Sequence, residues 1–100
     1  MTMKANVIEV VLFNPKPGIS DEQFLQAAAS VELFVQTQDG YVKRELGSNE
    51  DGLWIDTVYW TDLDCAQKAA QAAMESPICQ PFFGMIEETT MQMHHFSLAL

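Results

Sequence analysis

The first apolar segment, Val7–Phe13, constrains the fold more than any other part of the chain. It is short, rich in β-branched residues and stopped by turn-forming residues from Asn14 to Gly18, which predicts a strand. Alternate side chains of a strand point to opposite faces. One face carries Ile8, Val10 and Leu12, and the other carries Val7, Val11 and Phe13, interrupted by Glu9. Helices can cover only one of these apolar faces. The sequence therefore predicts a homodimer in which two sheets pack face to face.

A helix and a hairpin follow this strand. Ser20 and Gln23 have the spacing of a capping box, so a helix should begin after Ser20 and end near Gln38. Gly40 is placed to be its left-handed C-terminal residue. The segments Tyr41–Leu46 and Leu53–Trp60 are expected to be strands joined by the turn-forming residues 47–52.

The second half of the chain predicts another helix and a last strand. Thr61 or Asp62 should cap a helix with an alanine-rich body, Cys65–Glu75, which must lie close to the sheet because alanine has little volume. A short turn at 77–80 and a bulky apolar segment at 81–86 come next. The stretch Glu87–Leu100 lacks Gly, Pro, Asn and Asp, which predicts one strand about 46 Å long. Part of such a C-terminal strand would have no partner in its own chain, so we expect a second copy to pair with it.

The order strand–helix–strand–strand–helix–strand indicates an α+β fold of the ferredoxin-like type. We expect a single domain over residues 1–100, built as a four-stranded antiparallel sheet with two helices on one face.

Composition excludes several classes of partner. The chain has 14 acidic and 5 basic residues, a net charge of −9, which disfavours nucleic acid and anionic membrane surfaces.

The N-terminal residues lack the apolar core of a secretory signal, and no apolar run is long enough to span a bilayer. Cys65 and Cys79 fit neither a disulfide framework nor a CxxC or zinc motif, so we expect a cytoplasmic protein with no metal site.

The chain resembles the dimeric α+β barrel superfamily, and within it the domain of the antibiotic-biosynthesis-monooxygenase type. The resemblance covers nearly the whole chain. Its residues are the strand at 7–13 with Pro17-Gly18 and a capped helix, Gly40-Tyr41-Val42, Val58-Tyr59-Trp60 before Thr61-Asp62, and Ser76-Pro77 before a Phe-rich turn. It implies the fold and a homodimer, and it admits a cofactor-independent monooxygenase among several activities.

The heme-degrading members of the superfamily can be tested by residue. They carry an Asn on the first strand, a Trp on the second helix and a His on the turn after it. The corresponding stretches here are 10–12, 66–73 and 78–83, and none contains the required residue. Heme degradation is therefore disfavoured, and we expect no cofactor.

Oxygenation without a cofactor needs a base beside a dry, apolar cavity. The candidate catalytic residues on strands are Glu9, Asp56, His94 and His95, and the leading hypothesis is that one of the histidines is the base, assisted by Asp56 or Glu9. The two histidines are adjacent on a strand, so only one of them can face the helix-side cavity. The alternatives are a structural or solvated role for the histidines, and ion pairs that hold Glu9 and Asp56, with Arg44, the sole arginine, as one available partner.

Aromatic and sulfur-containing side chains could form the walls of such a cavity. The candidate substrate-binding residues are Trp54, Tyr59, Trp60, Phe83 and Met91. The alternative for the aromatic residues is packing in the core or at an interface, and for the methionine it is filling a gap beneath the alanine-rich helix. The sequence therefore predicts a dimer that binds a small apolar or aromatic metabolite, either as a cofactor-independent monooxygenase or as a non-catalytic binding or accessory protein.

Overall fold

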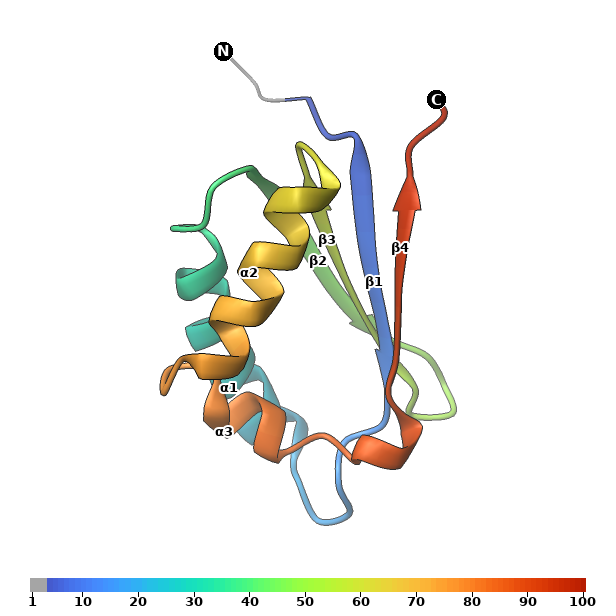
Figure 1. Cartoon of the computed structure of the whole chain (residues 1–100). Coiled ribbons are helices and arrows are strands. Elements are labelled where there is room, and N and C mark those ends of the chain that lie inside the picture. The colour runs from blue at the N-terminus through green and yellow to red at the C-terminus, as the bar shows by residue number, and fades with distance from the viewer. Residues whose placement is uncertain (1–3) are drawn as a thin grey trace.

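A computed structural model describes residues 4–100 of the chain. The strands are β1 (Val7–Phe13), β2 (Tyr41–Ser48), β3 (Trp54–Trp60) and β4 (Gln92–Ser97). The helices are α1 (Asp21–Val35), α2 (Leu63–Glu75), the short α3 (Gln80–Gly84) and a 3₁₀ turn, η1 (Glu88–Thr90). Figure 1 shows this order, with the helices on one side of the sheet.

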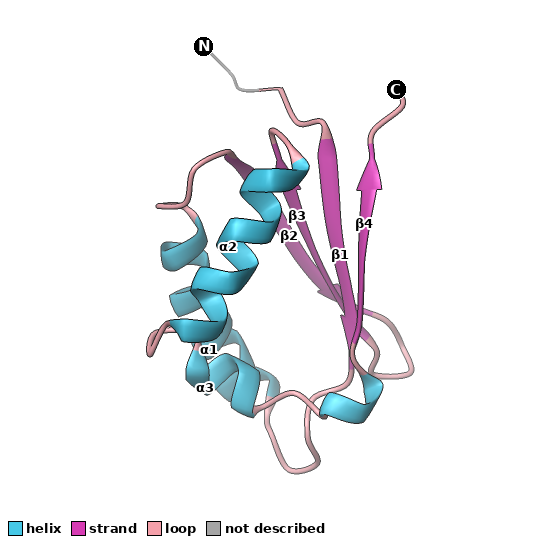
Figure 2. Ribbon diagram, in the orientation of Figure 1, coloured by secondary structure: helices cyan, strands magenta, loops and turns pink. Residues whose placement is uncertain are grey.

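The four strands form one antiparallel sheet in the order β2-β3-β1-β4. Figure 2 shows α1, α2 and α3 together on one face of this sheet and no helix on the other face. The predicted ferredoxin-like α+β fold is therefore confirmed. Strand β1 pairs with β3 on one side and with β4 on the other, so it is an inner strand of the sheet.

Helix α1 begins as the sequence predicts. The Ser20 side chain accepts a hydrogen bond from the backbone N–H of Gln23 at 3.1 Å, and the Gln23 side chain accepts one from the backbone N–H of Ser20 at 3.0 Å. The helix ends at Val35, before the predicted Gln38. Gly40 has a φ of 81°, as predicted, but it leads into β2 and does not cap the helix.

Helix α2 is capped by Asp62, whose side chain accepts a hydrogen bond from the backbone N–H of Cys65 at 2.8 Å. Its buried face consists of Ala66, Ala69 and Ala73, the small residues that allow a close approach to the sheet. The apolar segment after it is partly helical, which the sequence pattern did not predict: α3 begins at Gln80 with a proline in its first turn.

The prediction of one long C-terminal strand is wrong. The chain makes the 3₁₀ turn η1 first, and β4 begins only at Gln92. The Thr90 hydroxyl explains the turn, because it accepts a hydrogen bond from the backbone N–H of Asn14 at 2.9 Å and donates one to the carbonyl of Glu87 at 2.6 Å. Strand β4 is then paired with β1 along its whole length, from Gln92 to Ser97. Because no part of β4 extends beyond its partner β1, the prediction that a second copy pairs with an unpaired length of this strand is wrong.

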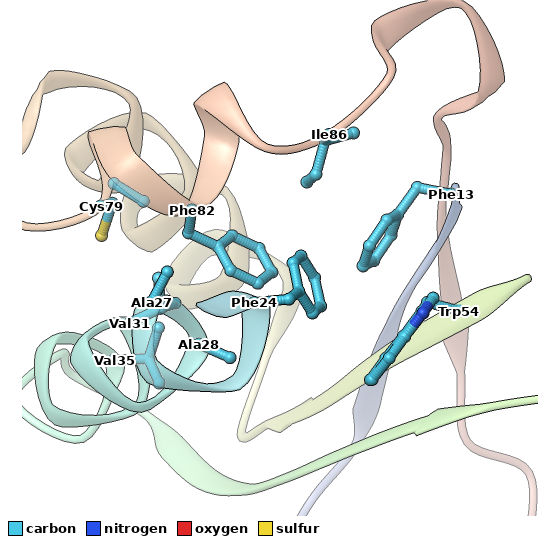
Figure 3. Packing of buried hydrophobic residues seen from close by; sticks show 11 residues of the cluster. Phe13, Phe24, Ala27, Ala28, Val31, Val35, Trp54, Cys79, Phe82 and Ile86 are labelled. Carbon is cyan, nitrogen blue, oxygen red and sulfur yellow. The ribbon is translucent and has the colours of Figure 1, made fainter. Parts of the chain in front are cut away.

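The main hydrophobic core lies between the sheet and helices α1 and α3. Phe24 of α1 is its centre: its ring centroid lies 4.8 Å from Trp54, 5.0 Å from Phe82 and 5.5 Å from Phe13. Figure 3 shows Phe24 between Phe13 and Phe82, with Trp54 beside them. This aromatic cluster fixes one end of the space between the helices and the sheet.

The opposite face of the sheet carries an apolar strip along β1 that no helix of residues 4–100 covers. Ile8, Val10 and Leu12 of β1 lie on it and are only partly buried. Ile55 of β3 and Phe96 of β4 are 40% and 54% exposed on the same face. The prediction that both faces of β1 are apolar is confirmed, and the second face lacks a cover.

Candidate functional site

A cavity of about 510 Å³ lies between the sheet and the helices. Its walls are mostly apolar and come from both layers of the fold, with contributions from all four strands, from α1, α2 and α3, and from the segment between α3 and β4. The volume falls within the range of about 300–1,000 Å³ that is typical of small-molecule sites. The apolar wall residues are Val11, Phe13, Val31, Val35, Val58, Trp60, Ala69, Ala70, Ala73, Met74, Phe82, Phe83, Ile86, Met91 and Met93.

The polar side chains of the cavity come mainly from the sheet. Glu9 of β1, Arg44 of β2 and Asp56 of β3 all line it. Glu9 and Asp56 are buried because the pleat places alternate residues of β1 and β3 on the helix side. The two remaining polar wall residues, Gln71 and Glu88, are exposed. The cavity thus combines an apolar enclosure with a small group of convergent charged side chains.

Glu9 is joined to His95 across the two neighbouring strands β1 and β4. The two residues are register partners, and Nε2 of His95 lies 2.8 Å from Oε2 of Glu9. The Glu9 side chain is 10% exposed and that of His95 is 23% exposed. Burial raises the pKa of Glu9 above its usual value, although the hydrogen bond from His95 opposes the shift. A carboxylate with a raised pKa beside an apolar space has the properties of a general base.

Arg44 and Asp56 form a buried ion pair. The guanidinium donates from Nε to Oδ1 at 2.9 Å and from Nη2 to Oδ2 at 2.7 Å, and a third bond runs from Nη1 to the carbonyl of Ala28 at 2.9 Å. Burial acts to lower the pKa of Arg44. The ion pair with Asp56 and the carboxylate of Glu32, whose Oε1 lies 3.6 Å from Nη1 of Arg44, outweigh this effect and raise the pKa overall. This two-bond geometry fixes the Asp56 carboxylate in place.

A tyrosine extends this cluster toward α1. The Tyr41 hydroxyl donates a hydrogen bond to Oε2 of Glu32 at 2.7 Å. Burial and this neighbouring carboxylate raise the pKa of Tyr41 to about 12. Because Arg44 is engaged by Asp56, Glu32 and Ala28, the cluster ties β2 and β3 to α1, and its guanidinium has few donors left for a ligand.

The structure brings together some of the predicted site residues. Glu9, Asp56, Trp60, Phe83 and Met91 all line the cavity, and His95 reaches it through Glu9. The indole Nε1 of Trp60 is the one buried side-chain polar atom without a hydrogen-bond partner among residues 4–100.

Three predicted site residues lie elsewhere. His94 is on the opposite face of the sheet, where its ring stacks on Phe96 at a centroid distance of 6.0 Å. Tyr59 is on that face as well, and its hydroxyl donates to Glu45 at 3.1 Å. The alternation of side chains along β3 and β4 excludes both from the cavity. Trp54 points to the helix side but packs on Phe24 in the core and does not line the cavity.

The cavity walls from α1 and α2 were not among the predicted site residues. Val31 and Val35 of α1, and Ala69, Ala73 and Met74 of α2, form this part of the cavity. The signal was present in the sequence: a face of alanines opposite a strand with bulky side chains leaves a space wherever the two layers do not touch.

No group of three or more His, Cys, Asp or Glu side chains in the described range 4–100 is placed to hold a metal ion. No helix in that range is long and apolar enough to cross a membrane.

The comparisons with known proteins identify the fold. Neither a protein-family model nor a curated protein matches the chain in sequence. Solved structures do match. A candidate antibiotic biosynthesis monooxygenase from Bordetella bronchiseptica superposes with a TM-score of 0.80 at 17% identity, over 97% of this chain and 100% of that chain.

Two further structures are similar over nearly the whole chain. A mutant form of SnoaB, a cofactor-independent oxygenase from Streptomyces nogalater, has a TM-score of 0.74 at 19% identity, over 97% of this chain and 96% of that chain. The protein At3g17210 from Arabidopsis thaliana has a TM-score of 0.74 at 12% identity, over 94% of this chain and 96% of that chain. At these identities the likeness concerns the fold. The resemblance expected from the sequence is confirmed at that level: the chain has the ferredoxin-like α+β fold found in proteins of the antibiotic-biosynthesis-monooxygenase type.

Proposed function

We propose that the chain binds a small, neutral, apolar or aromatic metabolite in the cavity and oxidises it with O₂ without a cofactor. The observation that carries the proposal is a buried carboxylate with a raised pKa, Glu9, in the wall of an otherwise apolar cavity of about 510 Å³. The fold shared with SnoaB, described as a cofactor-independent oxygenase, supports the same reaction class. The net charge of −9 favours a neutral ligand over an anion.

The proposed reaction needs one base and one oxygen molecule. Glu9 removes a proton from an acidic C–H group of the ligand, and the carbanion adds to O₂. The same proton then returns to the peroxide, giving a hydroperoxide. Loss of the second C–H proton with cleavage of the O–O bond leaves a ketone and releases one molecule of water. A CH₂ group and O₂ thus become C=O and H₂O, with the carbon oxidised and the oxygen reduced.

His95 has a positioning role in this proposal. Its hydrogen bond to Glu9 fixes the carboxylate against β1, and it lies outside the wall of the cavity. Asp56, the other carboxylate among the candidate catalytic residues, is held by two hydrogen bonds from Arg44. We therefore assign proton abstraction to Glu9 and assign Asp56 to the fixed wall.

The test uses anthrone, a neutral tricyclic ligand with an acidic CH₂ group. We expect the protein to accelerate oxygen uptake and anthraquinone formation above the rate without protein. Glu9→Gln should reduce the acceleration about 10²–10⁴-fold, the usual contribution of a general base, while anthrone binding persists. Glu75→Gln, an exposed carboxylate at the end of α2, is the matched control and should leave the rate unchanged.

One observation favours a second, non-catalytic function. The buried carboxylates in the cavity wall already have protein partners: Glu9 pairs with His95 and Asp56 pairs with Arg44. The same pairs would be expected in a simple binding or accessory protein. Binding of anthrone with no oxidation above the uncatalysed rate would establish this alternative and overturn the oxygenase.

The working unit in the proposal is a homodimer. A second copy packed on the uncovered face of the sheet would bury Ile8, Val10 and Leu12 together with the exposed Ile55 and Phe96. A cytoplasmic location belongs to the same proposal, and the free thiols of Cys65 and Cys79 are consistent with a reducing compartment.

A further inference from the structure

Three methionines that the proposed reaction does not use mark the opening of the cavity. Met74 of α2, Met91 just before β4 and Met93 on β4 line the cavity, and they are 66%, 45% and 45% exposed. Met93 is the register partner of Val11, itself a wall residue, so its side chain lies on the helix side of the sheet. Side chains that touch both the cavity and the solvent define its entrance. We call these three residues the methionine mouth.

The chemistry of the thioether fits an entrance for apolar ligands. Methionine is flexible, polarisable and apolar, so it adapts to varied ligand shapes. It is also the side chain most readily converted from apolar to polar by peroxide. In that step the sulfur lone pair attacks one peroxide oxygen and the O–O bond breaks. The products are a sulfoxide and water when the oxidant is hydrogen peroxide, and a sulfoxide and an alcohol when it is an organic hydroperoxide. The sulfur is oxidised and the peroxide is reduced.

Met85 provides an internal comparison. It is partly buried and packs against the main hydrophobic core. It does not line the cavity. A peroxide in solution or in the cavity should therefore react with the methionine mouth before it reacts with Met85.

We propose that the methionine mouth is an oxidation site: hydrogen peroxide or an organic hydroperoxide converts Met74, Met91 and Met93 to sulfoxides, and this lowers the affinity of the cavity for apolar ligands. The second half rests on the proposed function, because it requires that the cavity bind such ligands. A sulfoxide oxygen at the entrance is hydrated. Binding of an apolar ligand must either remove this water, which costs free energy, or leave the water in place of contacts with the ligand, and both weaken binding. The three residues lie on the helix side of the sheet, so the proposed dimer leaves them accessible.

The experiment uses Nile red, a neutral apolar dye, as the probe. Binding of the dye to the reduced protein is measured first by fluorescence titration. The protein is then treated with hydrogen peroxide, the sulfoxides are located by mass spectrometry of peptides, and the titration is repeated. We expect sulfoxide at the methionine mouth ahead of Met85 and a rise in Kd of about tenfold or more. Methionine sulfoxide reductases of both stereospecificities should restore the original Kd.

Two variants separate the methionine mouth from other oxidisable groups. The triple variant Met74→Leu, Met91→Leu and Met93→Leu keeps an apolar entrance and both cysteines but has no thioether there, so peroxide treatment should leave the variant's own Kd for Nile red unchanged. Met85→Leu is the matched control and should lose binding on oxidation as the natural chain does. Loss of binding in the oxidised triple variant would assign the effect to another residue and overturn the proposal.

The outcomes distinguish this inference from the proposed function. Unchanged Kd after complete oxidation of the three methionines would overturn the inference alone, because the cavity would still be shown to bind an apolar ligand. Oxidation of Met85 at the same rate as the other three would also overturn it. Failure of the reduced protein to bind Nile red would overturn the inference together with the proposed ligand class.

Discussion

His95 and Glu9 face each other across strands β4 and β1, with Nε2 of the histidine 2.8 Å from Oε2 of the carboxylate. Glu9 is the only charged residue of β1, and it lies on the buried face of that strand. A carboxylate in that position needs a partner, and the neighbouring edge strand supplies one. The pair therefore places an ionisable group in the cavity wall while keeping it hydrogen-bonded.

The raised pKa of Glu9 predicts a pH dependence of stability. A carboxyl group that holds its proton more tightly in the folded state contributes stability below its unfolded pKa, near 4.5. That contribution is lost as the pH rises through the higher folded pKa. We expect the natural chain to lose stability relative to Glu9→Gln as the pH is raised from about 4.5, measured by urea unfolding at a series of pH values.

The difference between the two proteins is the measured quantity, because other carboxylates contribute a common background. A gap between the natural chain and Glu9→Gln that stays constant over this pH range would contradict the assignment of the raised pKa to Glu9.

The buried pair of Arg44 and Asp56 predicts a strongly non-additive response to mutation. The two side chains are 3% and 10% exposed. Arg44→Met should therefore cost about 3–5 kcal/mol, because it leaves a buried carboxylate without its partner. The double variant Arg44→Met with Asp56→Leu should cost less than Arg44→Met alone, as no unpaired charge remains. Chemical denaturation of the natural chain and the variants measures both effects, and additive costs would show that the pair is not coupled.

The alternation of apolar residues and the positions of capping and turn-forming residues were enough to predict the fold. Alternation along Val7–Phe13 assigns its two faces, and the Ser20–Gln23 capping box locates the start of α1, because both depend on residues close together in the chain. The residue at which β4 begins could not be predicted in this way. The hydroxyl of Thr90 bonds to Asn14, which is 76 positions away, and only the assembled fold brings these residues together.

The candidate site could likewise be predicted only in part. The sequence restricts the bases to strand positions, and the two-residue period implies that His94 and His95 face opposite ways, but it does not say which one faces the helices. That choice depends on the register between β1 and β4, which sets His95 opposite Glu9. The helix-side walls depend on how far α2 stands from the sheet, a distance that alanine content limits but does not fix.

Gly40 predicts a substitution that the fold cannot accommodate. Its φ is +81°, and a Cβ at this position would lie 2.6 Å from Oγ1 of Thr61 and 2.7 Å from Sγ of Cys65. We expect Gly40→Ala to lower the free energy of unfolding by about 2 kcal/mol or more, from backbone strain and the clash together. Gly52 has a φ of +82° with nothing within 4 Å of the added Cβ, so Gly52→Ala isolates the backbone strain at about 1 kcal/mol. Equal losses of stability in the two variants would show that the contact with Thr61 and Cys65 relaxes without cost.

The uncovered face of the sheet predicts how the protein assembles. Phe96 is 54% exposed on this face beside the apolar residues of β1, and a lysine there would place a charge in any sheet-to-sheet interface. We expect the natural chain to sediment at twice its mass of 11.2 kDa and Phe96→Lys to sediment as a monomer. Leu33 is 69% exposed on α1, away from this face, so Leu33→Lys makes the same change of charge and should remain a dimer.

Circular dichroism of Phe96→Lys should retain the signal of the folded chain, because an edge strand tolerates lysine. A natural chain that sediments as a monomer at micromolar concentration would contradict the proposed dimer. Dissociation of Leu33→Lys together with persistence of the Phe96→Lys dimer would instead place the interface on the helices, and the apolar residues of β1 would then need another cover.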